Sequence, residues 1–396
     1  MKFPRLLFAL FLTVICTGAV VAQRIQKNRV IVLTDIEADP DDTQSLVRLL
    51  LYSNQIDIKG FIATTSVWQK NRVAPESIIK IIKAYAKVQP NLNKHEQGFP
   101  DAKFLLSLVK KGPAKYGMLA VGSGQDTEGS EWLIKILEEN DPRPLYISVW
   151  GGVNTLAQAL NKIKETKSAA EVKRLVGKLC VYTISDQDDS GIWLRNHFPE
   201  LKYIVSPGDE YGISTWSAIN TQIKGISNEE ISNRWIAQHI QQGHGPLGAV
   251  YPDVSWGVEG DTPAFLSLII NGLNNPEHPD WGGWGGRYEL MIPDFAKQKK
   301  GVSDVPLEPE TRAIWTDAAD NYTPFVPNDF GRAVRLDTNH YKDNKATLWR
   351  WRADFQNDFA ARMDWCLSDY KKANHPPVPV INQKEEITVT SGEGFG

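Results

Sequence analysis

Short apolar runs alternate with amphipathic segments along the chain from residue 29 to about residue 205. The apolar runs end in polar or glycine-containing stretches, and their length favours buried strands. The segments between them repeat apolar residues three and four positions apart, which is typical of helices. We therefore predict strands at 29–34, 56–65, 144–150, 178–185 and 201–206, and helices at 43–53, 75–88, 154–165 and 191–198.

Strands that alternate with helices in this way predict an α/β fold with a mostly parallel central sheet flanked by helices. In such sheets, ligands bind in the loops beyond the carboxyl ends of the strands. The acidic clusters of this sequence fall at strand ends of this kind. We therefore expect the functional site at the carboxyl edge of the sheet.

The pattern becomes looser after residue 206, where glycine, proline and tryptophan occupy long loops. Residues 343–373 predict a long amphipathic helix, and the paired prolines of 374–380 predict a linker. The last ten residues, 387–396, begin like a β-strand and turn. We predict a domain at 23–373, followed at 374–396 by a linker and the start of a C-terminal β segment. That segment either pairs with the main domain or begins a further β module of a longer protein.

The N-terminal residues have the features of a secretory signal peptide. Lys2 and Arg5 give a positive start, an apolar run follows, and Val20-Val21-Ala22 provides small residues at the cleavage point. A lipoprotein signal through Cys16 fits less well, because the bulky Ile15 precedes it. We predict a signal peptide at 1–22 and a secreted or periplasmic mature protein that does not associate with a membrane.

The composition is that of a soluble globular protein. Hydrophobic residues make up 42% of the 396 residues and charged residues 23%. The net charge of −3 gives no basic field for a nucleic acid polymer. Of the three cysteines, Cys16 lies in the signal peptide, so Cys180 and Cys366 remain as two buried thiols or one disulfide.

The strongest chemical signal is the acidic loop LTDIEADPDDTQSL at 33–46. Its five acidic residues lie between a predicted strand and a predicted helix; they are Asp35, Glu37, Asp39, Asp41 and Asp42. Packing so many carboxylates together is unfavourable unless a cation neutralises them. Oxygen ligands of this kind select calcium or magnesium over zinc. The alternative is a solvated acidic loop in which Asp42 caps the helix.

This loop resembles the aspartate-rich loop of nucleoside hydrolases. Three further segments resemble later family segments in the same order, at 61–71, 149–160 and 258–269. Two departures stand out: five residues, where the family has three, separate Asp35 from the aspartate pair, and Gly260 replaces a histidine. The sequences at 122–132 and 182–191 are more similar to a divergent branch of secreted nucleoside hydrolase-like, or cellulose-binding, proteins. The resemblance covers roughly residues 29 to 375.

The resemblance implies one calcium ion. Its ligands would be the side chains of Asp35, Asp42 and Asp261 and the backbone carbonyl of Trp150. Asp35 would also accept the proton of the attacking water, and Asp41 would hold a sugar hydroxyl. Glu37 and Asp39 fall in the extra length of the loop, where they are peripheral or alter the site.

Further substrate contacts are expected after the strand at 178–185. By analogy with the family, Asp186, Gln187 and Asp188 are candidates for binding sugar hydroxyls, while Asp189 caps the next helix. A plain acidic loop is the alternative. Asn154 is a second candidate for substrate binding, although a cap at the start of its helix is the favoured interpretation.

Trp284 lies in the glycine-rich loop HPDWGGWGGRYEL at 278–290, where an aromatic ring would stack on a sugar or a base. The alternative is that the loop packs over the core. The absence of the family histidine leaves the general acid open, and Glu259 and His244 are its candidate replacements.

These features predict a calcium-dependent hydrolase of N- or O-glycosidic bonds in ribofuranosides or related sugars. Its substrate would be a small molecule or an oligosaccharide, and the sequence is compatible with a homo-oligomer. The alternative is a non-catalytic protein that binds cellulose or another polysaccharide on the same fold. A phosphatase-like metal hydrolase fits less well, because no cluster of arginine and lysine accompanies the acidic loop.

Overall fold

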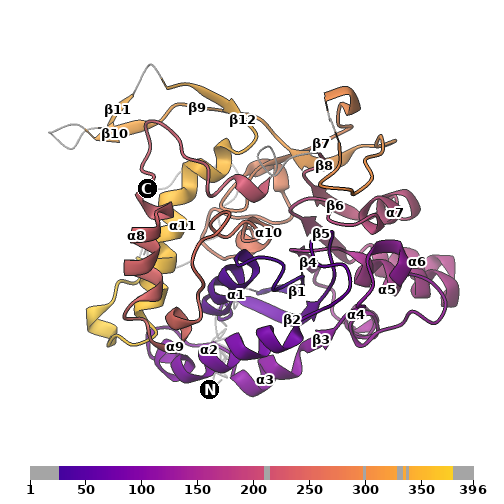
Figure 1. The fold of residues 1–396 in the computed structure, drawn as a ribbon, viewed down its shortest axis with the longest axis horizontal. Coiled ribbons are helices and arrows are strands. Elements are labelled where there is room, and N and C mark those ends of the chain that lie inside the picture. Colours follow the sequence, from indigo (N-terminus) through magenta and orange to yellow (C-terminus); the bar gives the residue numbers. More distant parts are fainter. Residues whose placement is uncertain (1–25, 209–214, 298–299, 328–332, 336–338, 378–396) are drawn as a thin grey trace, which may run out of the picture.

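The computed structural model describes residues 26–208, 215–297, 300–327, 333–335 and 339–377. Its centre is an eight-stranded sheet in the order β3-β2-β1-β4-β5-β6-β8-β7 (Figure 1). Neighbouring strands are parallel except for the antiparallel edge pair of β7 and β8. The strands are β1 (Asn28–Thr34), β2 (Ile56–Ala63), β3 (Val109–Lys111), β4 (Leu145–Val149), β5 (Leu179–Thr183), β6 (Lys202–Val205), β7 (Tyr288–Met291) and β8 (Ile314–Asp317).

Alternate residues of β1 enter two hydrophobic cores on the two faces of the sheet. Val30 and Val32 belong to the larger core, whereas Ile31 and Leu33 belong to the second. The larger core is completed by α1 (Asp41–Leu51), α2 (Pro75–His95), α9 (Gly245–Ala249), α10 (Pro263–Leu266) and α11 (Ala346–Asp364). The second is completed by α4 (Glu128–Glu138), α5 (Asn154–Thr166), α6 (Ala169–Val176) and α7 (Ser190–His197). In Figure 1, α4 to α7 lie together at the right of the sheet and α11 lies at the left.

The order of the strands in the central sheet determines where the site lies. From β1 the chain builds β2 and β3 on one side, and it then returns to build β4, β5 and β6 on the other. The direction of growth therefore reverses between β1 and β4. In open parallel sheets, ligands bind at the carboxyl ends of the strands beside such a reversal. The loops that follow β1 and β4 begin at Asp35 and Trp150.

The structure confirms the predicted α/β fold and each strand and helix predicted between residues 29 and 205. The bounds differ by a few residues, except that α2 continues through Pro90 to His95. The C-terminal helix α11 ends at Asp364, well before the predicted residue 373. The sequence analysis did not predict the helices α3 (Ala102–Ser107), α4 and α6, nor the short strand β3.

Outside the central sheet, two small antiparallel sheets lie along the later part of the chain. They pair β10 (Phe325–Pro327) with β11 (Ala333–Arg335), and β9 (Asp320–Tyr322) with β12 (Tyr341–Asp343). A one-turn helix, α8 (Asn233–Ile236), precedes them. The predicted signal peptide at 1–22 and β segment at 387–396 lie outside the described residues.

Two further features bear on the sequence predictions. Cys180 and Cys366 are free thiols and form no disulfide; Cys366 is buried and Cys180 is partly buried. Burial raises the pKa of the Cys180 thiol to about 11. In the part of the chain that the structure describes, every helix is too short or too polar to span a bilayer.

Candidate functional site

A small pocket lies at the carboxyl ends of β1 and β4, and we call it the acidic pocket. It is lined by Asp35, Asp39, Asp41, Asp42, Trp68, Trp150, Gln187, Trp216 and Asp261. Its volume is about 10 Å³, which is room for a single ion or water molecule. Five carboxylates thus surround a space of ionic size.

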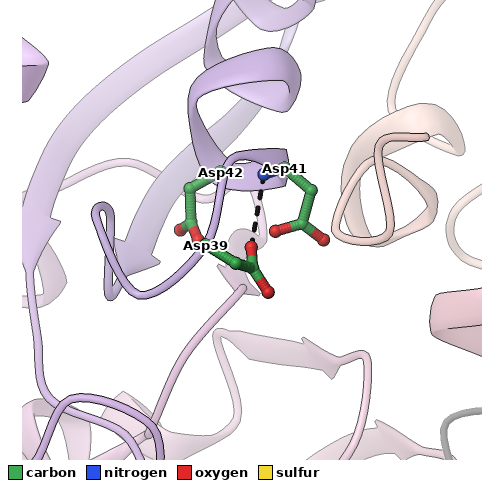
Figure 2. A group of neighbouring side chains, drawn as sticks. All are labelled: Asp39, Asp41 and Asp42. Atoms are coloured by element: carbon green, nitrogen blue, oxygen red, sulfur yellow. Dashed lines mark hydrogen bonds between the residues drawn. The ribbon is translucent and has the colours of Figure 1, made fainter. Parts of the chain in front are cut away.

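Three of these carboxylates form a compact group at the N-terminus of α1. Candidate ligand atoms of Asp39, Asp41 and Asp42 all lie within 4.8 Å of one another (Figure 2). The backbone N–H of Asp41 donates to Oδ1 of Asp39 across 3.2 Å, and the Thr34 hydroxyl donates to Asp42. The positive end of the helix dipole favours negative charge at this position.

Burial gives the pocket unusual acid–base properties. The loss of hydration raises the pKa of Asp35 to about 7. The pKa of Asp41, Asp42 and Asp261 is raised well above its usual value, first by burial and then by repulsion between the carboxylates. Buried carboxylates that repel one another in this way favour the uptake of protons or of a cation.

The donor set fits a hard divalent cation such as calcium. Every charged ligand is a carboxylate oxygen, and calcium binds six to eight such oxygens in flexible geometry. Oδ2 of Asp261 is buried and has no hydrogen-bond partner. A buried carboxylate oxygen without a hydrogen-bond partner is energetically unfavourable. The Asp261 oxygen therefore indicates that a bound ligand, and not another protein group, completes the site. We conclude that the acidic pocket can hold one cation.

The loops that follow neighbouring strands hold the pocket in shape. A Cβ at Gly151 would lie 2.7 Å from Oδ1 of Asp35, so glycine is required where the loop after β4 passes this side chain. The side chain of Gln69 donates to the carbonyls of Asp35 (3.1 Å) and Ile36 (3.3 Å). Gln187 donates to the carbonyl of Trp150, which was predicted as a metal ligand. The predicted residues Asp35, Asp41, Asp42, Trp150, Gln187 and Asp261 therefore meet at one place.

A larger cleft, which we call the tryptophan cleft, adjoins the acidic pocket. It is lined by Ala38, Asp39, Trp68, Trp216 and Trp256 and has a volume of about 450 Å³. The indole N–H of Trp216 donates to Oδ2 of Asp41 across 2.7 Å. Asp39, Trp68 and Trp216 line both spaces, so the tryptophan cleft and the acidic pocket share a wall.

Glu259, predicted as a replacement general acid, lies outside both spaces. Its side chain is fully buried and forms an ion pair with Arg48. Four donors surround its two oxygens, two from Arg48 and one each from Tyr251 and Thr262, both at 2.9 Å. A carboxylate has about four acceptor positions, and these donors occupy them. The role of Glu259 is therefore corrected from catalysis to structure.

Three predicted sugar-binding residues are also engaged by the protein. Asp186 forms two hydrogen bonds with Arg195, at 2.9 and 2.8 Å. Asp188 accepts from the backbone N–H groups of Asn154 (3.2 Å) and Ser190 (3.0 Å), and burial raises its pKa to about 7. The Asn154 side chain is buried and bonded to Thr64, Thr65 and Lys115. None of these three lines the acidic pocket or the tryptophan cleft.

Three further residues considered in the sequence analysis line neither the acidic pocket nor the tryptophan cleft; they are Trp284, His244 and Asp189. Trp284 packs in the larger core, with its ring edge-to-face against Phe355, as the alternative for its loop anticipated. His244 contacts Asp364 at 3.1 Å, at the end of α11. Asp189 accepts from the backbone N–H of Met118 and makes no side-chain cap on α7.

Sequence reasoning missed three residues that line the site. The sequence leaves the role of Asp39 in the long acidic loop open, whereas in the structure it lines both the acidic pocket and the tryptophan cleft. Trp68 and Trp216 were not singled out. A signal for Trp68 was present, because it lies in the loop that follows β2, as Asp35 lies in the loop that follows β1. Trp216 lies in a single 3-10 turn (Thr215–Ser217) outside the alternating strands and helices, so no pattern in the sequence pointed to it.

The mostly parallel sheet and the ligand-sized spaces at its carboxyl edge define an α/β protein that binds its ligand at the strand ends. Residues 29–288 match the family model described as "Cellulose-binding Sde182, nucleoside hydrolase-like domain". The chain belongs to this family.

A solved structure supports the same fold. A nucleoside hydrolase-related hypothetical protein from Saccharophagus degradans, associated with carbohydrate metabolism, is 36% identical. The match covers 91% of this chain and 77% of that chain, with a TM-score of 0.73. The inosine-uridine preferring nucleoside hydrolase from Bacillus anthracis is 11% identical, with 85% of this chain and 100% of that chain covered and a TM-score of 0.43. No curated protein sequence matches the chain.

Proposed function

We propose that this protein is an extracellular, calcium-dependent hydrolase of N- or O-glycosidic bonds in furanosides or related sugars. The observation that carries the proposal is the convergence of five carboxylates on an ion-sized pocket beside an aromatic cleft. The description of the family as cellulose-binding and the association of the Saccharophagus protein with carbohydrate metabolism support a carbohydrate as ligand.

The acidic pocket would hold calcium through Asp39, Asp42 and Asp261, with Asp35 and Asp41 beside them. A bound calcium ion would neutralise these carboxylates and polarise water and sugar hydroxyls. Compared with the ligands predicted from the sequence, this assignment adds Asp39, because its carboxylate lies within 4.8 Å of those of Asp41 and Asp42. It leaves out the carbonyl of Trp150, which accepts a hydrogen bond from Gln187, and it gives Asp35 the role of a base beside the ion.

The roles of the side chains follow from their surroundings. Asp35 lines the acidic pocket directly after β1, where its carboxylate would lie beside the calcium ion and take a proton from water. Asp41 would accept a hydrogen bond from a sugar hydroxyl, and Trp216 fixes its orientation. The negative field of the pocket would stabilise positive charge that develops at the anomeric carbon as the glycosidic bond breaks.

The replacement Asp35→Asn tests this proposal. The assay uses nucleosides, 4-nitrophenyl ribofuranoside and arabino-oligosaccharides, each with calcium and with chelator. We expect the wild type to require calcium, and Asp35→Asn to lose about 10²–10⁴-fold in rate, because an amide cannot accept the proton. Glu37→Gln is the matched control, since Glu37 lies in the same loop but bonds to Ser77, outside the pocket. An Asp35→Asn protein with full activity would overturn the mechanism.

A non-catalytic carbohydrate-binding protein is the second candidate. Two observations favour it. Glu259 forms an ion pair with Arg48 and is not available as a general acid. Among the residues lining the tryptophan cleft, Asp39 alone carries an ionisable side chain. A leaving group in the cleft would have little help from a general acid. If the wild type binds oligosaccharides but cleaves none of the substrates above, this second function replaces the first.

A further inference from the structure

We infer that the ligand is an oligosaccharide of at least two sugar units, with its rings stacked in the tryptophan cleft and hydroxyls of one unit directed at the acidic pocket. This inference rests on the proposed function, because it takes a carbohydrate as ligand and the acidic pocket as its anchor. It adds the class of substrate and the residues that select it.

The volumes of the acidic pocket and the tryptophan cleft indicate which part of a ligand each can hold. The acidic pocket, at about 10 Å³, is too small for any sugar ring. The adjoining cleft, at about 450 Å³, falls in the range of roughly 300–1,000 Å³ typical of sites for drug-sized ligands. A single sugar is much smaller than such a ligand. One sugar unit therefore leaves part of the cleft empty, and two or more fill it.

The chemistry of the cleft matches a sugar better than a nucleobase. Its walls are three indole rings, and Asp39 contributes a carboxylate, which in its ionised form only accepts hydrogen bonds. Sugar hydroxyls donate to such acceptors while the C–H faces of the rings lie on the indoles. The edge of a nucleobase carries donors and acceptors together, and a site selective for it must match both.

The tryptophans form a wall that reaches from the acidic pocket to solvent. Trp68 is 51% exposed and Trp256 is 74% exposed, which is unusual for the largest apolar side chain. An exposed aromatic patch beside a polar site is typical of a ligand-binding surface. A chain of sugars can therefore extend outward over these rings from the unit anchored at the acidic pocket.

Trp216 is the fixed part of this wall. Its hydrogen bond to Asp41 sets the orientation of the ring. Its other support is Gly260, where an added Cβ would lie 2.2 Å from both Cδ1 and Nε1 of the indole. The indole therefore occupies the space that any side chain at position 260 would need. A ring held from two sides keeps its stacking face ready for a ligand, which lowers the entropic cost of binding.

Calorimetry on the full chain with calcium tests the inference. The probes are glucose and arabinose, cello- and arabino-oligosaccharides of two to five units, and inosine. We expect affinity to rise at least about tenfold from a monosaccharide to the best oligosaccharide, and we expect inosine to bind more weakly than that oligosaccharide. Replacing one stacked ring in Trp68→Ala or Trp256→Ala should weaken oligosaccharide binding about two- to tenfold. Calcium affinity should stay unchanged in Trp256→Ala, since Trp256 lines the tryptophan cleft but not the acidic pocket.

Trp281→Ala is the matched control, because this ring is 65% exposed but stacks on His278 outside the cleft. It should bind oligosaccharides like the wild type. Equal affinity for monosaccharides and oligosaccharides, or tighter binding of inosine, would overturn the inference. These results differ from a failure of the proposed function, in which the wild type binds no calcium or cleaves no glycosidic bond while still showing the dependence on chain length.

Discussion

Arg48 and Glu259 form an ion pair in which both side chains are fully buried. Arg48 also donates to the carbonyl of Phe355 (2.9 Å) and to the side chain of Gln356, both on α11. The guanidinium lies 4.0 Å from the centre of the Phe359 ring. Arg48 thus connects α1 and α11 with the loop that carries Asp261. The Arg48–Glu259 pair therefore holds in place two of the segments that line the acidic pocket.

Removing one partner of this pair should be strongly destabilising. We expect Glu259→Ala to lower the free energy of unfolding by about 3–5 kcal/mol, because Arg48 would keep a buried charge without a counter-ion. Urea unfolding measures this effect. Asp369→Ala is the control, since Asp369 pairs with Lys372 at an exposed position and should change stability by less than about 1 kcal/mol. A loss below 1 kcal/mol for Glu259→Ala would contradict the structural role.

The acidic loop offers a direct test of the cation site. Asp39→Asn should weaken calcium binding at least about tenfold, because it removes one carboxylate from the group around the pocket. Glu37→Gln should leave the affinity unchanged, since the Glu37 side chain bonds to Ser77 and faces Arg72. Calorimetric titration with calcium compares the two. Equal losses in both variants would mean that the loop acts only through its total charge.

Stability without calcium should fall as the pH rises. The folded-state pKa of Asp35 is about 7, above the usual 3.8, and the pKa values of Asp41, Asp42 and Asp261 are raised in the same direction. Between about pH 4 and pH 7 the folded protein therefore holds protons that the unfolded chain has released. By linkage, each further rise in pH favours the unfolded chain in this window.

Thermal unfolding in chelator at pH 5 and pH 7.5 measures this effect. We expect the lower Tm at pH 7.5, and we expect calcium to raise Tm more at pH 7.5 than at pH 5, because binding requires ionised carboxylates. A calcium-free protein that becomes more stable across this range would show that the carboxylates do not interact as the structure places them.

Gly260 should be intolerant of even one methyl group. In Gly260→Ala the new Cβ would meet the Trp216 ring at 2.2 Å and Oδ2 of Asp41 at 2.6 Å, so the ring must move and its hydrogen bond must break. We expect at least about a tenfold loss of oligosaccharide affinity. At Gly257 an added Cβ would meet Trp216 only at ordinary contact distances from 3.4 Å, which makes Gly257→Ala the matched control. Comparable binding by both variants would show that the ring position is unimportant.

The mature N-terminus is a separate prediction from the sequence. Cleavage after Val20-Val21-Ala22 should leave a protein that begins near Gln23 and lies outside the cytoplasm. Mass spectrometry of the native protein checks this. Recovery of residues 1–22 in the native protein would rule it out.

The fold was predictable because the signals for it are local. In β1 every residue from Val30 to Leu33 is apolar and buried between two layers of helices, and such runs are visible in the sequence itself. The later strands β7 and β8 were not predicted, because they form the antiparallel edge of the sheet from short segments between long loops.

The candidate site was predictable only in part. Residues in the loops after the strands, such as Asp35, Trp150 and Gln187, line the acidic pocket, because the topology of the sheet brings strand ends together. Asp186 and Glu259 have the same chemistry but are neutralised by Arg195 and Arg48, which lie on different elements. Such pairings depend on tertiary contacts, and a single sequence does not reveal them.

The position of Asp261 has a consequence for the motions of the chain. Its carboxylate meets those of Asp41 and Asp42 from a loop far along the sequence, and like charges at close range push these two parts of the chain apart. A bound cation attracts the carboxylates of both segments, so it would hold the first βα unit and the loop before α10 together. Without the cation, this loop should open before the sheet does, and its amide hydrogens should exchange early. Because the same loop carries Gly260 beneath Trp216, the loss of the ion would also release the wall on which a sugar rests.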